Sequence, residues 1–412
     1  MMKAYLIIFL FFIALNVNAQ WIFQTTGVSV PLWDIEFINE NTGWVCGEQG
    51  VILKTTNGGN VWEIQNTGIN NKVLYGIYPV NDSVVYCVGF FETILKTTNG
   101  GENWIAIENG PAGQGDSYYS VFFLNEDTGW IGSNSLATRK TTDGGSSFNN
   151  QFIFTIPRDL FFKDAMNGAG CGWGATIGTT TNGGNNWNVE QYCTPGLGCE
   201  DFYRFSFIDD FTGFVVGRSG TTLRTTDFGF NWDSVGFVEG NAESMICSRF
   251  KSDSIGWAGG TSYLFKSTNG GGSWKRETPT AGYFTSIYAI NDSIVWACGN
   301  PGRIWHTKSG GDTTVNITQI GNEIPSGFAL KQNYPNPFNP STNIQFDLPK
   351  DGFVTLKVYD VSGREVETLV NEFKKAGSYI AGFNASHLSS GVYFYKINAG
   401  SFEETRRMIL VK

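Results

Sequence analysis

The sequence predicts an all-β protein, a seven-bladed β-propeller followed by a small C-terminal immunoglobulin-like β-sandwich. Three observations support this class. A pattern rich in Thr, Asn and Gly recurs along most of the chain with the period of a propeller blade. The 412 residues include 52 glycines, with 15% aromatic and 16% charged residues, which favours short strands and tight turns over exposed helices. Where the repeat ends, a different pattern of short strands begins.

Charge and histidine content exclude several classes of function. The formal net charge is −9, whereas binding to a nucleic acid requires a basic surface. Only two histidines are present, His306 and His387. Neither a histidine-based metal site nor a Ser-His-Asp triad is therefore expected. We expect no metal, no cofactor and no nucleic-acid partner.

The N-terminus has the features of a secretory signal peptide. Lys3 supplies a positive charge, residues 4–15 are apolar, and the small residues Val17 and Ala19 precede a cleavage site before Gln20. This apolar run is shorter than the roughly 20 residues that span a bilayer core. The alternative is an N-terminal membrane anchor. Residues 1–19 are assigned to a signal peptide, and the mature chain is expected outside the cytoplasm.

The repeat is clearest in two copies, Lys54–Trp62 and Lys96–Trp104, which share the pattern Lys-Thr-Thr-Asn-Gly-Gly-x-x-Trp. Further copies are more diverged. The second glycine of each copy recurs at intervals of 39 to 45 residues, at Gly59, Gly101, Gly145, Gly184, Gly229, Gly271 and Gly311. A period near 40–45 residues, with four short strands per unit, is typical of a propeller blade.

Each copy also has the same pattern upstream. In the first, the alternating residues 34–38 lead through an Asn-rich turn into Thr42-Gly43-Trp44. Period-two alternation, a polar turn and a second apolar run predict two paired strands. A third strand precedes the Asn-Gly-Gly turn and a fourth follows it. Each copy thus predicts one four-stranded blade.

The ring is expected to close through the N-terminus. The seventh copy reads Gly310-Gly311-Asp312-Thr313 and lacks the aromatic residue that the other six carry. The segment that starts at Trp21 matches the register of the segment that starts at Trp62. We therefore expect the N-terminal segment to supply the outer strand of the last blade, which removes the free sheet edges of an open ring. The propeller is assigned to residues 20–313.

The Thr-x-Asn-x-Gly-x-x-Trp string resembles the Asp-box, or BNR-repeat, hairpin of sialidases and related propellers. With Thr-Gly-Trp upstream, the full repeat is most similar to the Ycf48-like family of photosystem II assembly factors. The Thr and Asn side chains are expected to hydrogen-bond to the turn, and Trp to pack between blades. Because the string recurs seven times, it indicates a fold and marks no single active site.

The C-terminal segment closely resembles the type A sorting domain of the type IX secretion system. The resemblance rests on four motifs, Asn333–Pro340, Val358–Gly363, Leu388–Phe394 and Met408–Lys412. It implies export across the outer membrane by the type IX machinery, to the cell surface or beyond, in a Gram-negative host of the Bacteroidetes type. Residues 331–412 are assigned to this domain and 314–330 to a linker. The alternative is an adhesive β-sandwich.

Candidate ligand-binding residues lie near two long loops, 108–117 and 191–201, on the face where propeller loops vary most. Aromatic rings beside arginines suit stacking on a sugar or gripping a peptide. The alternative is that the tyrosines pack between blades and the arginines pair with Glu200 and Asp201. The candidates are Tyr118, Tyr119, Arg158, Tyr192, Tyr203, Arg204 and Arg218.

One pair of acidic residues invites comparison with glycosidases. Asp34 and Asp159 both start innermost strands, and glycosidase chemistry needs two carboxylates about 5–10 Å apart. Their blades, the first and fourth, are expected nearly opposite each other, which argues against joint catalysis. The sialidase resemblance does not extend to its arginine triad or its Phe-Arg-Ile-Pro motif. No catalytic residue is assigned.

Seven cysteines in an exported chain suggest at least one disulfide and one unpaired thiol. Cys193 and Cys199 share one Gly- and Pro-containing loop and are the preferred pair. Cys46 and Cys298 occupy one repeat position in the adjoining first and seventh blades, which makes a bridge between them the weaker alternative. The remaining three are expected to pack as small apolar residues, and no cysteine spacing suggests zinc.

Together these features predict an exported propeller that acts as a non-catalytic binding module for a glycan or a protein. The expected partners are the type IX machinery, through residues 331–412, and an unidentified surface ligand. Membrane association is expected only through surface anchoring. Two alternatives remain, a surface glycoside hydrolase of the Asp-box type and an assembly or scaffold factor of the Ycf48-like kind.

Overall fold

The all-β class is confirmed by a computed structural model of the chain. It describes residues 21–107, 115–135, 137–152, 156–193, 199, 201–236, 244–277, 280–308, 310–311, 317–319, 324–339, 341–385, 388 and 390–411. The predicted signal peptide and most of the two candidate loops lie outside these residues. The chain divides into two compact units, with the boundary between Gly311 and Asp312.

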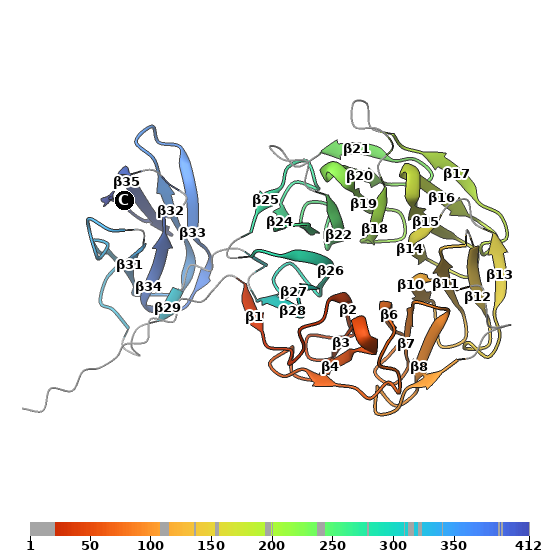
Figure 1. Ribbon diagram of the computed structural model, residues 1–412. Coiled ribbons are helices and arrows are strands. Elements are labelled where there is room, and N and C mark those ends of the chain that lie inside the picture. The colour runs from red at the N-terminus through yellow and green to blue at the C-terminus, as the bar shows by residue number, and fades with distance from the viewer. Residues whose placement is uncertain are drawn as a thin grey trace, which may run out of the picture. The chain divides into compact units, whose positions relative to one another are not determined.

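Residues 21–311 form a ring of sheets (Figure 1), and residues of the innermost strands line a cavity in a central channel. In the part of the chain that the structure describes, the ring contains seven antiparallel sheets of four strands. The first strand of each sheet lies innermost and contacts the first strands of both neighbouring sheets. These strands are β2 (Leu32–Phe37), β6 (Leu74–Pro79), β10 (Tyr118–Phe123), β14 (Pro157–Phe162), β18 (Phe202–Phe207), β22 (Met245–Phe250) and β26 (Tyr283–Ala289).

In four of the seven sheets the second strand begins with a Gly-aromatic pair, and the third strand of each sheet ends at the start of the Asp-box turn. The second strands are β3 (Gly43–Gly47), β7 (Val85–Gly89), β11 (Gly129–Ser133), β15 (Gly168–Gly172), β19 (Gly213–Gly217), β23 (Gly256–Gly260) and β27 (Val295–Asn300). The third strands are β4 (Ile52–Thr55), β8 (Thr93–Thr97), β12 (Ala137–Thr141), β16 (Thr176–Thr180), β20 (Thr222–Thr225), β24 (Leu264–Ser267) and β28 (Arg303–Thr307).

The outermost strand of the last sheet comes from the N-terminus. β1 (Ile22–Gln24) pairs antiparallel with β28, with Ile22 opposite His306. Trp21 is buried and its indole Nε1 donates a hydrogen bond to the Glu277 carboxylate at 3.0 Å. In the other six sheets the outer strand follows the third strand directly. These are β5 (Glu63–Ile64), β9 (Ile105–Ala106), β13 (Asn149–Phe152), β17 (Asn188–Gln191), β21 (Asp233–Gly236) and β25 (Lys275–Arg276).

The Asp-box string forms the turn between the third and fourth strands. In the first copy, Thr55 Oγ1 accepts a hydrogen bond from the Gly59 N–H at 2.8 Å, and Asn57 Oδ1 accepts one from the Val61 N–H at 2.9 Å. Gly59 has φ +86°, and a Cβ there would lie 2.1 Å from the Gln24 side chain. Only glycine fits both the backbone conformation and the space.

The Gly-aromatic motif packs neighbouring blades together. The aromatic residue at the second position of the second strand stacks on the ring that ends the next innermost strand, as in Trp296 on Phe37 at 3.8 Å and Trp130 on Phe162 at 3.7 Å. A Cβ on Gly43 would lie 2.4 Å from the Phe37 ring, so this glycine makes room for its own blade's aromatic residue. The repeated motif is thus explained by packing between blades.

The second unit contains two antiparallel sheets that share one apolar core. One sheet has the strand order β29-β34-β31-β30 and the other β33-β32-β35-β36. Their strands are β29 (Ile317–Gln319), β30 (Ala329–Leu330), β31 (Ser341–Leu348), β32 (Gly352–Tyr359), β33 (Glu365–Lys374), β34 (Gly377–Asn384), β35 (Gly391–Ala399) and β36 (Phe402–Leu410).

The segment predicted as a linker, 314–330, differs from that prediction. It contributes β29, which pairs with β34, and β30, which pairs with β31. Both are very short edge strands in a polar stretch, so the sequence carries too little alternation to predict them. Within the described ranges, no helix is long and apolar enough to cross a membrane.

Candidate functional site

Every innermost strand of the ring carries a β-bulge near its start. The pairing with the second strand shifts register there by one residue, for example between Leu32 and Asp34. A bulge turns the extra side chain away from the sheet's regular alternation. The bulged residues are Trp33, Tyr75, Tyr119, Arg158, Tyr203, Ile246 and Thr285. All seven lie at the same end of the central channel.

Aromatic rings at this end form a continuous series over four blades. Trp33 meets Tyr75 edge-on at 5.6 Å, and Tyr75 lies 5.2 Å from Tyr119. The Arg158 guanidinium then lies over the Tyr119 ring at 4.7 Å and over the Trp173 ring at 5.4 Å. Trp173 belongs to the short 3₁₀ turn η2 (Trp173–Ala175) and is 48% exposed. We call these five residues the channel mouth.

Two aromatic rings bracket the Arg158 guanidinium. Its Nε is buried and has no hydrogen-bond partner among the described residues. Cation–π contacts orient such a group without using its N–H donors. The mouth therefore presents a cation whose orientation is set by aromatic rings.

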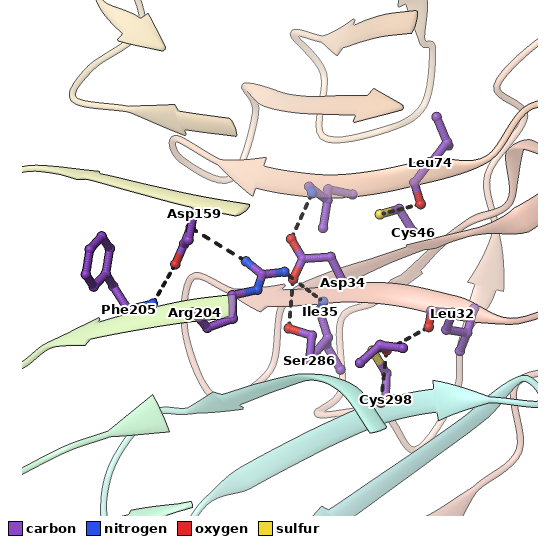
Figure 2. A network of polar contacts seen from close by, with 12 residues as sticks. Leu32, Asp34, Ile35, Cys46, Leu74, Asp159, Arg204, Phe205, Ser286 and Cys298 are labelled. Atoms are coloured by element: carbon purple, nitrogen blue, oxygen red, sulfur yellow. Dashed lines mark hydrogen bonds and ion pairs between the residues drawn. The ribbon is translucent and has the colours of Figure 1, made fainter. Parts of the chain in front are cut away.

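Below the mouth, one arginine spans the channel (Figure 2). Arg204 Nη2 lies 2.8 Å from Asp34 Oδ1, and its Nη1 lies 3.9 Å from Asp159 Oδ1. Ser286 Oγ also donates to Asp34 Oδ1 at 2.7 Å. Asp34 Oδ2 accepts the N–H of Ile77 at 3.1 Å. The network joins the first, second, fourth, fifth and seventh blades.

The charged groups of this network stabilise each other's ionised forms. Burial alone disfavours the charged guanidinium, but the neighbouring Asp34 and Asp159 carboxylates raise the pKa of Arg204 above its ordinary value. Burial raises the pKa of Asp159, an effect that Arg204 and two backbone N–H groups oppose. Arg204 therefore stays protonated, and it occupies both carboxylates.

The channel widens into a cavity of about 260 Å³ whose lining comes from all seven blades. Besides the Arg204 network, it holds Glu36 and Arg249. Burial raises the pKa of Glu36 to about 8, with Arg249 acting to lower it and Asp34 to raise it. The Arg249 guanidinium lies 4.6 Å over the Tyr288 ring. Within the described ranges, no three His, Cys, Asp or Glu side chains are grouped as metal ligands.

The structure brings together two of the seven predicted ligand-binding residues, Tyr119 and Arg158. Tyr203 occupies the equivalent bulge of the fifth blade. Arg204 lies inside the channel and pairs with Asp34 and Asp159, so the alternative pairing with Glu200 or Asp201 does not describe it.

The other three candidates lie elsewhere. Tyr118 is 1% exposed, and its hydroxyl accepts a hydrogen bond from Arg139 Nη1 in the core, so it has no surface for a ligand. Tyr192 follows the outer strand β17 and donates to Glu190 Oε2 at 2.8 Å. Arg218 begins the 3₁₀ turn η3 (Arg218–Gly220), which joins β19 to β20. The first blade has an equivalent 3₁₀ turn, η1 (Glu48–Gly50), between β3 and β4.

Three mouth residues, Trp33, Tyr75 and Trp173, were not predicted. A signal for two of them is present in the sequence. Trp33 and Tyr75 occupy the same repeat position as the predicted Tyr119, one residue after the first residue of the innermost strand. Comparing that position across the repeat would have found them. Trp173 lies in a turn whose position depends on the three-dimensional structure.

The expected separation of Asp34 and Asp159 is wrong. The blades are far apart around the ring, yet both carboxylates reach the axis, where one guanidinium contacts both. Both also accept backbone N–H groups, as Asp159 does from Phe205 at 2.9 Å. The carboxylate oxygens of Asp34 and Asp159 thus contact Arg204 and backbone N–H groups. The two residues form a structural bridge and are not arranged as an acid and a base.

Cys193 and Cys199 form a disulfide. The other five cysteines are buried and free, so the alternative bridge between Cys46 and Cys298 is absent. Burial disfavours the reactive thiolate form. It raises the pKa of the Cys298 thiol, and it raises that of the Cys247 thiol to about 12.

The chain is thus a β-propeller protein with an appended C-terminal β-domain. Residues 332–412 match the family described as secretion system C-terminal sorting domain. Residues 13–156 match the family of the photosynthesis system II assembly factor YCF48. These matches confirm both predicted resemblances. The sorting domain marks type IX secreted proteins of Bacteroidetes, and the protein is secreted or located at the cell surface.

Solved structures agree with the fold. YCF48 bound to a D1 peptide is 18% identical, with a TM-score of 0.58, and the match covers 70% of this chain and 97% of that one. YCF48 from Cyanidioschyzon merolae is also 18% identical, with a TM-score of 0.57 and coverage of 70% and 98%. PorZ, a surface component of the type IX secretion system of Porphyromonas gingivalis, is 10% identical, with a TM-score of 0.54 and coverage of 91% and 59%. No curated protein matches the chain significantly.

Proposed function

We propose that this exported propeller is a non-catalytic binding protein whose partner, a glycan or a protein segment, docks at the channel mouth. The observation that carries the proposal is the unbroken series of rings from Trp33 to Trp173, with Arg158 stacked between the last two. Clustered aromatic residues and an arginine are the side chains that most often dominate binding energy at an interface.

The comparison with known propellers supports this use of the fold. A YCF48 propeller has been solved with a bound peptide. The Arg204 bridge supports a binding role over catalysis, because it engages both axial carboxylates below the mouth. Stacking on the mouth rings would suit a sugar as well as an aromatic or proline-bearing peptide segment.

The test is retention of ligands by the immobilised mature chain. Surface polysaccharides and envelope proteins of the producing cell are passed over it, and the retained species are compared with those of Arg158→Ala and Trp173→Ala. Arg276→Ala is the matched control, since this guanidinium also lies over a ring, that of Tyr263, but on the outer strand β25. We expect retention to fall at least tenfold in the two mouth variants and to stay unchanged in the control.

The alternatives predict different results. Retention followed by release of soluble sugars would identify a glycoside hydrolase. A chain that retains neither polysaccharide nor protein would point to a scaffold. Equal loss in all three variants would show that the mouth is not the binding surface.

A further inference from the structure

The cavity below the Arg204 bridge has one aromatic side. Tyr78 lies 5.3 Å from Phe122, and Phe122 meets Phe161 edge-on at 5.6 Å. These rings come from β6, β10 and β14, three consecutive innermost strands, and all three border the cavity. Their contacts form a curved apolar wall along one half of the channel.

The other half of the cavity is polar. Ser248 and Arg249 from β22, Tyr288 from β26 and Glu36 from β2 border it. Arg249 is fixed by its contact with the Tyr288 ring, 4.6 Å away.

The charges in the cavity nearly cancel. The Arg204 guanidinium is matched by the Asp34 and Asp159 carboxylates. Glu36 and Arg249 add one group of each kind, and burial favours the neutral form of the Glu36 carboxyl. An ion would therefore meet no strong net attraction, whereas a molecule with both donors and acceptors would find partners for each.

We propose that this cavity binds a single neutral sugar ring, either free or as the terminal unit of a glycan. A pyranose has apolar C–H faces, which suit the wall of Tyr78, Phe122 and Phe161. Its hydroxyl edge both donates and accepts, which suits Glu36 and Arg249. The cavity of about 260 Å³ holds roughly nine water volumes of ~30 Å³, enough for one such ring.

This inference is independent of the proposed function. Four of the five mouth residues precede the Arg204 bridge along the innermost strands, and the cavity residues that would contact the sugar follow it. None of the five mouth residues lines the cavity. A ligand at one of them does not require a ligand at the other.

The experiment measures binding of methyl glycosides to the mature chain by saturation-transfer NMR and titration calorimetry. The probes are methyl glycosides of glucose, galactose, mannose and N-acetylglucosamine, with glucuronate as an anion and glutamate as an anion that also carries an ammonium group. We expect one neutral glycoside to bind and its affinity to fall at least tenfold in Arg249→Gln and in Glu36→Gln. Arg276→Ala, on the outer strand β25, is expected to bind it with unchanged affinity.

A milder variant guards against loss of folding. Tyr288→Phe removes one hydroxyl from the cavity and keeps the ring below Arg249, and we expect it to weaken binding while the melting temperature is retained. Tighter binding of an oligosaccharide with the same terminal unit would identify a glycan end as the source, and equal binding a free sugar. The proposal is overturned if no neutral glycoside binds, if only glucuronate or glutamate binds, or if binding is lost in Arg158→Ala but kept in the cavity variants.

Discussion

Arg204 is the residue on which most of the axial contacts converge. It is partly buried, with a side chain 20% exposed, and it neutralises carboxylates from two other blades. A buried ion pair need not stabilise a protein relative to an apolar replacement, but removing one partner leaves the other charges without compensation. Its role is therefore best tested by comparing partial and complete removal of the network.

We expect Arg204→Met to lower the free energy of unfolding by about 3–5 kcal/mol, because Asp34 and Asp159 would be left as uncompensated buried acids. The measurement is urea denaturation at neutral pH. The triple variant Asp34→Asn, Asp159→Asn, Arg204→Met carries no such charge and is expected to be more stable than the single variant. If the single and triple variants were equally destabilised, lost packing and not uncompensated charge would be the cause.

Glu36 predicts a dependence of stability on pH. Its pKa is raised from 4.5 to about 8 by burial, in the presence of Arg249, Asp34, Arg204 and Asp159. Between these two values the folded protein holds a proton that the unfolded chain has released. The contribution of Glu36 to stability is therefore fully present below pH 4.5 and is lost as the pH rises through 8.

We accordingly expect the wild-type unfolding free energy to fall from pH 5.5 to pH 8.5 more steeply than that of Glu36→Gln, by up to about 1.4 kcal/mol per pH unit. Urea denaturation of both proteins across this range measures the difference. Parallel curves for the two proteins would show that Glu36 ionises normally in the folded state.

At the scale of single elements, the joint between the last and first blades depends on β1. Trp21 is buried in a cluster with residues of the sixth and seventh blades, as Trp62 is with residues of the first and seventh. Gln24 extends the joint, since its Nε2 donates to the Gly58 carbonyl at 3.1 Å and its Oε1 accepts from Trp62 Nε1 at 3.2 Å. The same Gln-to-Gly contact links Gln151 to Gly183 between the third and fourth blades.

We expect Trp21→Ala to destabilise the propeller by about 3–5 kcal/mol, the cost of truncating a large buried aromatic residue, and Trp62→Ala to cost a similar amount. Ile22→Ala is the control, because Ile22 on the same strand is 51% exposed. Chemical denaturation of the three variants provides the measurement. A Trp21 variant as stable as the control would mean that β1 contributes little to closing the ring.

The strongly repeated elements were the most predictable from the sequence. The first strands, the Gly-aromatic strands and the Asp-box turns recur with their side chains in register, so each copy reinforces the others. The short strands β29 and β30 were missed, because their pairing depends on β34 and β31, which lie far along the chain. The site was predictable only in part. Tyr119 and Arg158 could be predicted because each lies near a long variable loop. The Arg204 bridge could not, because Asp34, Asp159 and Arg204 lie in different blades and share no local sequence pattern.

For the whole molecule, the division into two units places the proposed binding surface and the sorting domain in different units. The propeller ends at Gly311 by its internal contacts, and the sorting domain has its own apolar core. The buried residues of that core all belong to the second unit. The sorting domain and the channel mouth thus belong to different units.

We expect a chain that lacks residues 332–412 to accumulate in the periplasm and to be absent from the cell surface, while its propeller keeps the melting transition of the full protein. Fractionation followed by immunoblotting, with calorimetry of the purified propeller, tests both parts. Surface display of the shortened chain would show that another segment directs export. A lowered melting transition would show that the units stabilise each other.

The pairing of β1 with β28 has a consequence for the order of events during synthesis. Gln24 contacts His306, which lies 282 positions later in the sequence. The strand β1 is therefore synthesised first but can pair with β28 only at the end of synthesis of the propeller. Contacts this distant along the chain form late and slowly in folding. Before the seventh blade has been synthesised, the ring cannot close, because β28 is not yet present to pair with β1. The ring closes only when the seventh blade is present. An incomplete chain therefore cannot form the closed ring.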